Sequence, residues 1–272
     1  MLIVRTLIKN ANYEVDGFNM LDKWLKEVDR YADLIIMVDD NSIDGTYEKC
    51  KEFSDKVIIE RTKFKDFYTE EQFMQNEIWE LIRKNAQEGD WVIAVDSDEI
   101  MEDSFVSMKD YLMNNKGANC YSFQFIHLWE KDAFRMDKMW GNRWAYRMFR
   151  FYDVKFKVRL RNEIHLNGLP DYVKGFEYIP SSCGTIHYGY YPKERRISKS
   201  EKYLQYARGG DLVCAKSILD NKVSLVKLQD RLDIMKEMNL NPILETNNFL
   251  YKDIFENFKR RMNERAYDYN VD

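Results

Sequence analysis

The chain has 272 residues, of which 45% are hydrophobic and 15% aromatic, enough for a sizeable core. Its formal net charge of −4 gives no general attraction to nucleic acid or to anionic lipid. No apolar run reaches the roughly 18 residues of a membrane span and no signal peptide is recognisable, so we expect a cytoplasmic protein without a transmembrane segment. The four cysteines lack the C-x-x-C spacing of a zinc finger and are interpreted as reduced, mostly buried thiols.

The first hundred residues alternate between short apolar runs and stretches with helical periodicity. The runs predict strands at 2–8, 34–38, 57–59 and 91–95. The periodic stretches predict helices at 19–31, 46–53 and 69–85. This alternating order predicts a parallel sheet covered by helices on both faces.

The pattern changes near residue 100. A helix is predicted at 104–114, followed by aromatic-rich segments whose alternation predicts antiparallel strands, at 120–129, 144–152, 155–160 and 184–191. From about residue 192 the chain is charged and predicted to be helical. Its last amphipathic segment, 248–267, is interpreted as a helix packed on the body, with peripheral membrane contact as the alternative.

Carboxylates follow two of the predicted parallel strands, where ligands bind in open α/β sheets. Asp39 and Asp40 come directly after the strand at 34–38 and can accept hydrogen bonds from a base or a ribose, although such residues also build ordinary turns. Asp96 and Asp98 follow the strand at 91–95, and carboxylates spaced in this way can share a hard divalent cation with substrate phosphates.

Two further features allow both a functional and a structural interpretation. His187 is either a packed residue or a further ligand of a metal site. The segment from Trp140 to Arg150 is either the lip of a ligand site, with Arg143 or Arg147 on a diphosphate, or a packed aromatic strand with solvated charges.

Three motifs resemble family 2 glycosyltransferases. Val38-Asp-Asp-Asn-Ser-Ile-Asp-Gly-Thr46 resembles the DD-x-S-x-DGT signature of that family, and Asp90-Trp-Val-Ile-Ala-Val-Asp-Ser-Asp-Glu99 resembles its DW-hydrophobic-DxDE segment. Ile186-His-Tyr-Gly-Tyr190 resembles an element of a bacterial and phage branch. The resemblance is strong over residues 1 to about 100, fair near 140–190 and absent from about 200 onward.

The resemblance implies a GT-A fold, an α/β class with a Rossmann-like, mostly parallel sheet flanked by helices and an antiparallel acceptor-side region. We therefore expect a nucleotide-sugar-binding half at 1–103 and an acceptor-binding half at 104–195. A C-terminal helical extension is expected at 196–272.

The resemblance also implies roles for individual residues. Asp39 and Asp40 would contact the nucleobase and ribose. Asp98 would bind the Mn²⁺ or Mg²⁺ that bridges the diphosphate, with His187 as a further ligand. The other residues of the implied nucleotide site are Thr6, Arg61, Asp96 and Ser97.

The implied reaction is inverting, metal-assisted transfer of a sugar from a nucleoside-diphosphate donor, a UDP-sugar being favoured, to a hydroxyl of an unknown glycan, lipid or protein. A carboxylate should take the proton from the acceptor hydroxyl. Related branches carry a His-Glu pair where this chain has His165 followed by Leu166. Glu163, on the same face of a strand as His165, is the predicted base, with Asp137 and Asp171 behind it.

Two other classes compete with this hypothesis. A nucleotidyltransferase would also use strand-end carboxylates and Mg²⁺, but it usually has a Gly-rich basic loop after its first strand, and residues 5–17 contain only Gly17. A catalytically inactive sugar-nucleotide-binding protein of GT-A fold is the third hypothesis, because the Glu expected after His165 is missing.

Overall fold

The protein is described by a computed structural model over residues 1–65, 67–137, 140–141, 144–158, 168–175, 178–206, 210–238 and 248–270. The chain folds into two compact units, each built from separate stretches of sequence. The first unit comprises Met1–Ile100, Lys109–Tyr121 and Tyr146–Ile179, and the second comprises Met101–Met108, Ser122–Ala145 and Pro180–Asp272. The bounds of these units differ from the boundaries at residues 103 and 195 that are expected from the sequence. The expected donor-binding and acceptor-binding roles of the parts stay predictions.

The first unit is built on a parallel sheet with strand order β6-β1-β4-β5. Its strands are β1 (Leu2–Ile8), β4 (Leu34–Asp39), β5 (Val57–Arg61) and β6 (Trp91–Ala94). An antiparallel strand, β10 (Trp144–Arg150), pairs with β6 through Met148 to Arg150. The predicted α/β class, with a mostly parallel sheet and added antiparallel strands, is therefore confirmed.

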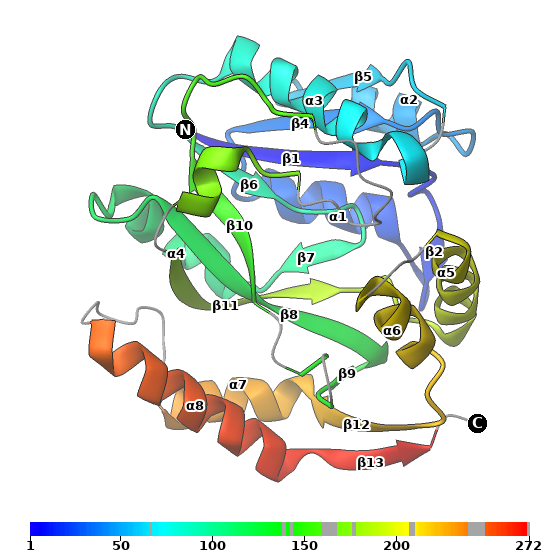
Figure 1. Ribbon diagram of the computed structural model, residues 1–272, viewed down its shortest axis with the longest axis vertical. Coiled ribbons are helices and arrows are strands. Elements are labelled where there is room, and N and C mark those ends of the chain that lie inside the picture. The colour runs from blue at the N-terminus through cyan, green and yellow to red at the C-terminus, as the bar shows by residue number, and fades with distance from the viewer. Residues whose placement is uncertain are drawn as a thin grey trace. The chain divides into compact units, whose positions relative to one another are not determined.

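Helices cover both faces of this sheet (Figure 1). On one face α3 (Phe67–Asn85) packs Ile78, Trp79 and Ile82 against side chains of β1, β4 and β6. On the other face lie α1 (Met20–Asp29) and α2 (Thr46–Phe53), which contact each other. The strands and helices predicted in the first hundred residues are therefore present in the structure.

Shorter elements complete this part of the chain. β2 (Glu14–Val15) and β3 (Phe18–Asn19) form a hairpin, and Asn19 caps α1 by accepting a hydrogen bond from the Asp22 backbone N–H at 3.1 Å. The remaining elements are β7 (Glu99–Met101), α4 (Ser104–Asn114) and the 3₁₀ helix η1 (Asp171–Gly175). Residues 155–158 form no strand, and 159–160 lie outside the described residues.

The second unit contains an antiparallel arrangement, β13-β12-β9-β8, with β11 pairing with β8 and β7. Its strands are β8 (Cys120–Glu130), β9 (Ala133–Arg135), β11 (Tyr178–His187), β12 (Lys222–Lys227) and β13 (Tyr267–Asn270). Its later helices are α5 (Lys193–Tyr206), α6 (Gly210–Ser217), α7 (Leu228–Glu237) and α8 (Asn248–Arg265).

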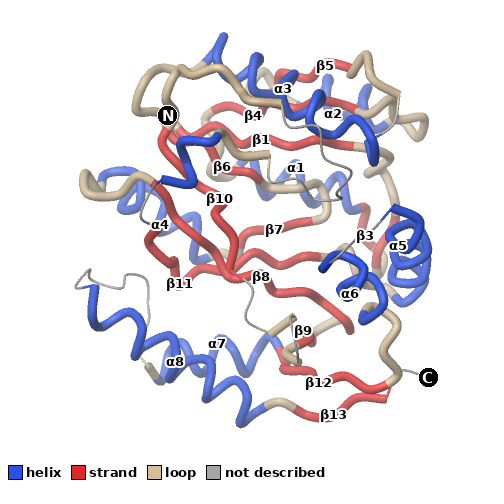
Figure 2. The backbone as a smooth tube through the Cα atoms, in the orientation of Figure 1, coloured by secondary structure: helices blue, strands red, loops and turns tan. Residues whose placement is uncertain are grey.

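The C-terminal part is not wholly helical, in contrast to the prediction. β12 and β13 run side by side (Figure 2), with Val223 opposite Tyr269 and Leu225 opposite Tyr267. The physical reason is burial, because Val223, Leu225 and Val226 are all buried although charged residues surround them in the sequence.

The last helix, α8, packs against the second unit. Phe258 and Met262 are buried in a core cluster with Ile234 and Met235 of α7. Among the described residues, no helix has both the length and the apolar character that crossing a bilayer requires. All four cysteines are free thiols, and three of them are buried.

Candidate functional site

Asp39 ends β4 as a fully buried carboxylate. Its Oδ2 accepts a hydrogen bond from the Ser42 backbone N–H at 3.0 Å, and its backbone carbonyl accepts one from the Thr62 N–H at 2.9 Å. The second carboxylate oxygen, Oδ1, is buried and has no hydrogen-bond partner among the described residues. An ionised carboxylate in this position retains an acceptor for a ligand.

Asp40 is also buried, and it lies beside the end of β1. Its backbone N–H donates to the Ile8 carbonyl at 2.8 Å, and Lys9 Nζ lies 2.8 Å from Asp40 Oδ2. Lys9 is about half exposed, and no motif in the sequence points to it. The cation reduces the cost of keeping a second buried charge next to Asp39.

The rest of this motif is structural. Asp44 accepts hydrogen bonds from the Thr46 hydroxyl at 2.6 Å and from the Asn12 backbone N–H at 3.0 Å. Burial by itself would raise the pKa of Asp44, but these hydrogen bonds outweigh it and lower the pKa. Gly45 has a φ of 85°, a left-handed conformation that glycine adopts without strain. The turn interpretation therefore holds for Asp44 and Gly45, whereas Asp39 and Asp40 lie at the strand end.

Thr6 lies on β1 and Arg61 on β5, the two strands that flank β4. Thr6 is buried in β1, and its hydroxyl donates to the Leu7 carbonyl at 3.2 Å. Arg61 pairs in register with Asp39, but its guanidinium lies 4.4 Å from the centre of the Tyr47 ring and its Nη2 lies 2.8 Å from Glu48 Oε1. The side chain of Arg61 thus contacts α2.

The second acidic motif forms a tight turn after β6. The Asp96 backbone N–H donates to Glu99 Oε2 at 3.0 Å, and the Glu99 N–H donates back to the Asp96 carbonyl at 2.8 Å. Arg147 Nη2 donates to Glu99 Oε1 at 2.7 Å and lies 3.9 Å from Asp96 Oδ2. Glu99 is buried, Asp96 is exposed, and Ser97 and Asp98 are half-buried. The buried Glu99 therefore holds the turn that presents the other three side chains.

The Glu99–Arg147 pair settles part of the interpretation of the 140–150 segment. Burial raises the pKa of Glu99 above its ordinary value, and the charge of Arg147 opposes that shift. Arg147 is consequently tied to the acidic turn and is not a freely solvated charge. Trp140, by contrast, is fully buried in the second unit, and Arg143 lies outside the described residues.

A polar cluster that the sequence analysis missed lies where α3 covers β1. Arg5 is 8% exposed and donates from Nη1 to Gln75 Oε1, while Gln75 Nε2 lies 3.3 Å from Glu71 Oε1. Gln72 is buried as well. Burial lowers the pKa of Arg5 to about 10, and the charge of Asp96 works in the opposite direction. One signal was present in the sequence, because the first turns of α3 carry polar residues on the side that later turns fill with apolar ones.

His187 belongs to the second unit, where it packs among aromatic rings. Its Nδ1 lies 2.9 Å from His127 Nδ1, and its Nε2 lies 3.4 Å from Lys199 Nζ. Its ring centre is 5.0 Å from that of Tyr190, and the His127 ring is 5.2 Å from Trp140. These contacts favour the packed interpretation, and the metal-ligand role of His187 stays a prediction.

The candidate bases receive unequal support. Glu163 and His165 lie outside the described residues. Asp137 accepts two hydrogen bonds from Arg135, at 2.7 and 2.9 Å, and although burial alone would raise its pKa, these bonds lower it. Asp171 lies 3.7 Å from Lys174 in η1. Asp137 is thus fixed in a structural ion pair.

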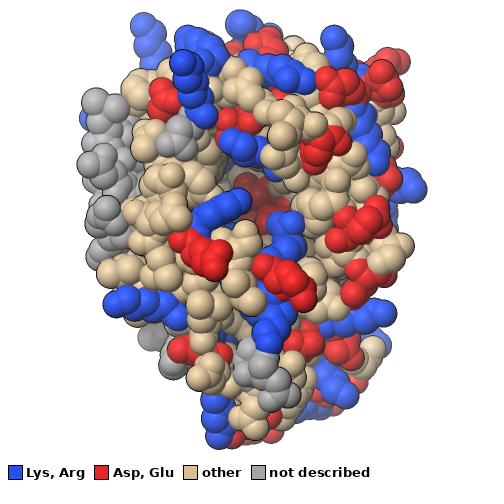
Figure 3. Space-filling view, turned by 90° about the vertical axis from the view of Figure 1, so that its right-hand side faces the viewer, with Lys and Arg blue, Asp and Glu red and all other residues tan. Residues whose placement is uncertain are grey.

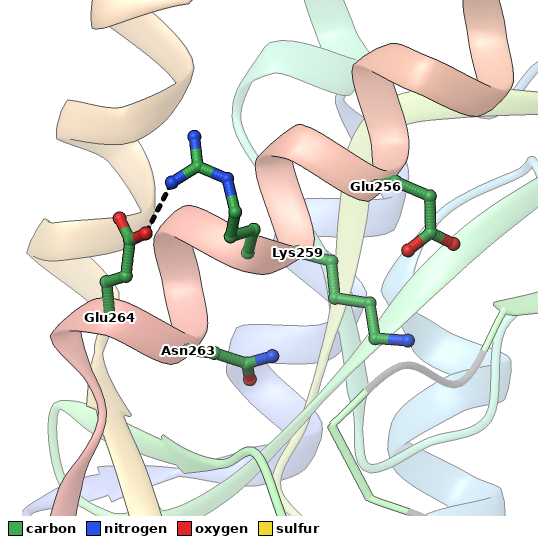
Figure 4. A pocket seen from close by; sticks show the side chains of 5 residues that line it. Glu256, Lys259, Asn263 and Glu264 are labelled. Atoms are coloured by element: carbon green, nitrogen blue, oxygen red, sulfur yellow. Dashed lines mark hydrogen bonds and ion pairs between the residues drawn. The ribbon is translucent and has the colours of Figure 1, made fainter.

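Charges of both signs are interspersed on the face of the molecule shown in Figure 3. A shallow hollow along α8 (Figure 4) is lined by Glu256, Lys259, Arg260, Asn263 and Glu264. All five side chains come from one helix, and Arg260 is paired with Glu264. This hollow contains none of the strand-end residues described above.

Within the described part of the chain, no three His, Cys, Asp or Glu side chains gather as a metal-binding group. Mg²⁺ and similar cations commonly use one or two carboxylates and take further ligands from substrate phosphates and water. Asp96 and Asp98, at the surface of one turn, suit that second mode of binding.

No protein-family model matches the chain, and no curated protein matches it. Among solved structures, S. aureus TarS is similar at 11% identity and a TM-score of 0.46, over 80% of this chain and 42% of the TarS chain. A 4-diphosphocytidyl-2C-methyl-D-erythritol synthase is similar at 12% identity and a TM-score of 0.37, over 55% of this chain and 74% of its own. CMP:2-keto-3-deoxy-manno-octonic acid synthetase, in complex with CTP, is similar at 9% identity and a TM-score of 0.33, over 55% and 71%. The likeness is partial, and the functional assignment depends on the residues described above.

Proposed function

We propose that this protein is an inverting, metal-assisted glycosyltransferase of family 2, which transfers a sugar from a nucleoside-diphosphate donor to a hydroxyl acceptor. The observation that carries the proposal is the buried Asp39, whose Oδ1 is left open at the carboxyl end of β4. A buried, unfilled acceptor is costly in the free protein, and a donor group of a ligand would satisfy it.

The arrangement of the strand ends supports a nucleotide as that ligand. Asp39 and Asp40 are the acceptors proposed for the base and ribose hydroxyls, with Thr6 and Arg61 on the neighbouring strands. The turn of Asp96, Ser97 and Asp98 follows β6, which is the neighbour of β1 on its other side. Such convergence at one edge of a parallel sheet is typical of nucleotide-binding α/β proteins.

We propose that Asp98 and Asp96 bind Mn²⁺ or Mg²⁺. A role of His187 as a further ligand stays a prediction. A bound divalent cation would offset the charge that develops on the leaving diphosphate. The chain's own residues fix the geometry of the turn, because Glu99 receives hydrogen bonds from the Asp96 backbone and from Arg147. Glu163 remains the proposed base for the acceptor hydroxyl.

Donor binding and donor hydrolysis test the proposal. The purified protein would be incubated with UDP-, GDP- and dTDP-sugars and MnCl₂, and the release of nucleoside diphosphate followed over time. We expect slow release from one donor class and its loss in Asp98→Ala, while Asp55→Ala, at a surface position before β5, keeps the wild-type rate. A thermal-shift screen with the same donors adds a readout independent of turnover, because a ligand of the native state raises the Tm.

The outcomes separate the competing hypotheses. Donor binding without hydrolysis or transfer would favour the inactive sugar-nucleotide-binding protein. Pyrophosphate release from a nucleoside triphosphate and a sugar phosphate would identify a nucleotidyltransferase. The absence of binding and turnover with every nucleotide sugar, with and without metal, would refute the proposal.

A further inference from the structure

We propose that Arg5 binds an oxyanion of the donor, either its distal phosphate or a carboxylate on its sugar. This inference rests on the proposed function and adds to it a binding residue inside the sheet. Asp39, Asp40 and the acidic turn provide acceptors, whereas Arg5 provides a group of donors.

The guanidinium of Arg5 is incompletely paired. Arginine carries five N–H donors and stays charged in proteins. Among the described residues, Gln75 is the one hydrogen-bond partner of Arg5, and no carboxylate forms an ion pair with it. Arginines withdrawn from water are normally held by several acceptors, and even the partly buried Arg150 donates to the carbonyls of Ala118, Gly89 and Asn115. Arg5 therefore has donors available for a ligand.

A neutral side chain fixes the orientation of Arg5. Gln75 accepts from Nη1 with a neutral amide, so it fixes the side chain without cancelling the charge. Gln75 is itself held by Glu71, and an added Cβ at Gly168 would lie 2.1 Å from Gln75 Oε1, which shows how closely the backbone at Gly168 approaches the amide. A guanidinium oriented by a packed neutral partner is suited to binding a planar or tetrahedral oxyanion.

Arg5 lies on the strand next to the one that leads into the turn of Asp96, Ser97 and Asp98. Arg5 pairs in register with Ala94, the last residue of β6, and its charge interacts with those of Asp96, Arg147, Glu71 and Glu99. Arg5 is therefore close enough to the turn of Asp96 to Glu99 to interact electrostatically with its carboxylates. A donor whose diphosphate reaches Asp98 has a phosphate or sugar substituent close to this turn.

The test compares ligands that differ by one anionic group. Affinities would be measured by calorimetry, in MnCl₂, for the nucleoside monophosphate and diphosphate of whichever base the wild type binds, such as UMP and UDP. UDP-glucose and UDP-glucuronate form the second pair. The variants are Arg5→Met, which removes the donors, and Gln75→Glu, which keeps Arg5 but closes it with an ion pair.

The control is Arg150→Met. Arg150 is a partly buried arginine of the same unit, and its hydrogen bonds go to backbone carbonyls and its guanidinium lies 4.5 Å from the centre of the Trp91 ring. We expect this variant to lower the Tm and to leave all affinity ratios at their wild-type values.

Both Arg5→Met and Gln75→Glu should reduce affinity for the ligand that carries the recognised oxyanion by about 10- to 100-fold, the range for a charge-assisted hydrogen bond. If the distal phosphate is recognised, UDP weakens and UMP does not. If a sugar carboxylate is recognised, UDP-glucuronate weakens and UDP-glucose does not. Should Arg5→Met fail to fold, Gln75→Glu decides between these outcomes.

Unchanged ratios for both ligand pairs would overturn the inference and leave Arg5 as a structural residue, while the proposed function would stand. If the wild type binds none of these nucleotides, the proposed function itself fails, and the inference fails with it. The two failures are therefore distinguishable in one set of measurements.

Discussion

Asp39→Asn should separate ligand binding from stability, because the native carboxylate is buried with one oxygen satisfied and one open. The substitution keeps an oxygen for the hydrogen bond from Ser42 and puts an N–H₂ group where a ligand N–H would dock. Losing a hydrogen bond to a charged acceptor costs about 1.5–3 kcal/mol, which corresponds to nucleotide binding weaker by about 10- to 100-fold.

The free protein should not lose stability in the same variant. Removing a buried charge offsets the burial of an unfilled amide, so the Tm should stay within about 2 °C of wild type or rise. Calorimetry with the best-binding nucleotide and a thermal melt without ligand measure the two quantities. A fall in Tm of more than about 4 °C together with wild-type affinity would show that Asp39 only builds the turn.

The matched control is Asp33→Asn, at the amino end of β4. Asp33 accepts hydrogen bonds from the Leu2 backbone N–H at 2.6 Å and from Lys109 Nζ at 2.9 Å. Burial by itself would raise the pKa of Asp33, but these hydrogen bonds outweigh it and lower the pKa. This variant should lower the Tm by about 2–4 °C and leave nucleotide affinity unchanged.

Three more predictions concern stability. The pKa of Asp33 is lower in the folded than in the unfolded state. The stability that Asp33 contributes is therefore complete above its unfolded-state pKa, near 4, and is lost as the pH falls through its folded-state pKa. Asp33→Asn should therefore flatten the acid limb of a stability curve from urea denaturation at several pH values, and an unchanged limb would contradict this. Gly168→Ala should displace the Gln75 side chain, because the new Cβ would lie 2.1 Å from Gln75 Oε1. We expect a lower Tm and weaker diphosphate binding. Wild-type values of both would show that the Gln75 side chain adapts freely. Arg231→Met should lower the free energy of unfolding by about 3–5 kcal/mol, because it leaves the buried Glu102 unpaired. In urea denaturation, the double variant Arg231→Met/Glu102→Gln should recover most of that loss. Equal losses in the single and the double variant would argue against an unpaired-charge effect.

The sequence predicted the parallel half of the fold well because its strands are compact apolar runs. Residues 34–38 are a short, uninterrupted apolar run of the kind that a buried parallel strand has, and Leu34–Asp39 is that strand. β12 escaped prediction because it is short, with Lys222 and Lys227 at its ends and Ser224 between its apolar residues. Its pairing partners β9 and β13 are far away in sequence. Charge-rich segments of this kind carry little local information about their partners.

The candidate site was predictable where a rule links sequence to position. Carboxylates that follow parallel strands must lie at one edge of the sheet, so Asp39 and Asp96 could be named in advance. Gln75 was harder to name, because a glutamine inside an amphipathic helix is ordinarily exposed. The polar residues in the first turns of α3 were a weak signal, and the packing shows Gln75 buried against Arg5. Arg5 was not identified because it lies within a strand whose pattern is mostly apolar.

The interleaved composition of the first unit has a consequence for synthesis on the ribosome. Phe149 and Phe151 complete the core in which Val92 and Trp79 are buried, and they follow β6 by more than fifty residues in the printed sequence. At roughly 5–20 residues per second, translation needs several seconds after β6 is made to supply the residues that complete the core on the parallel sheet. During that delay the apolar side of β6 is open to chaperones and to aggregation, so expression of residues 1–103 alone should give insoluble protein, while a chain extended to residue 179 has every segment of the unit.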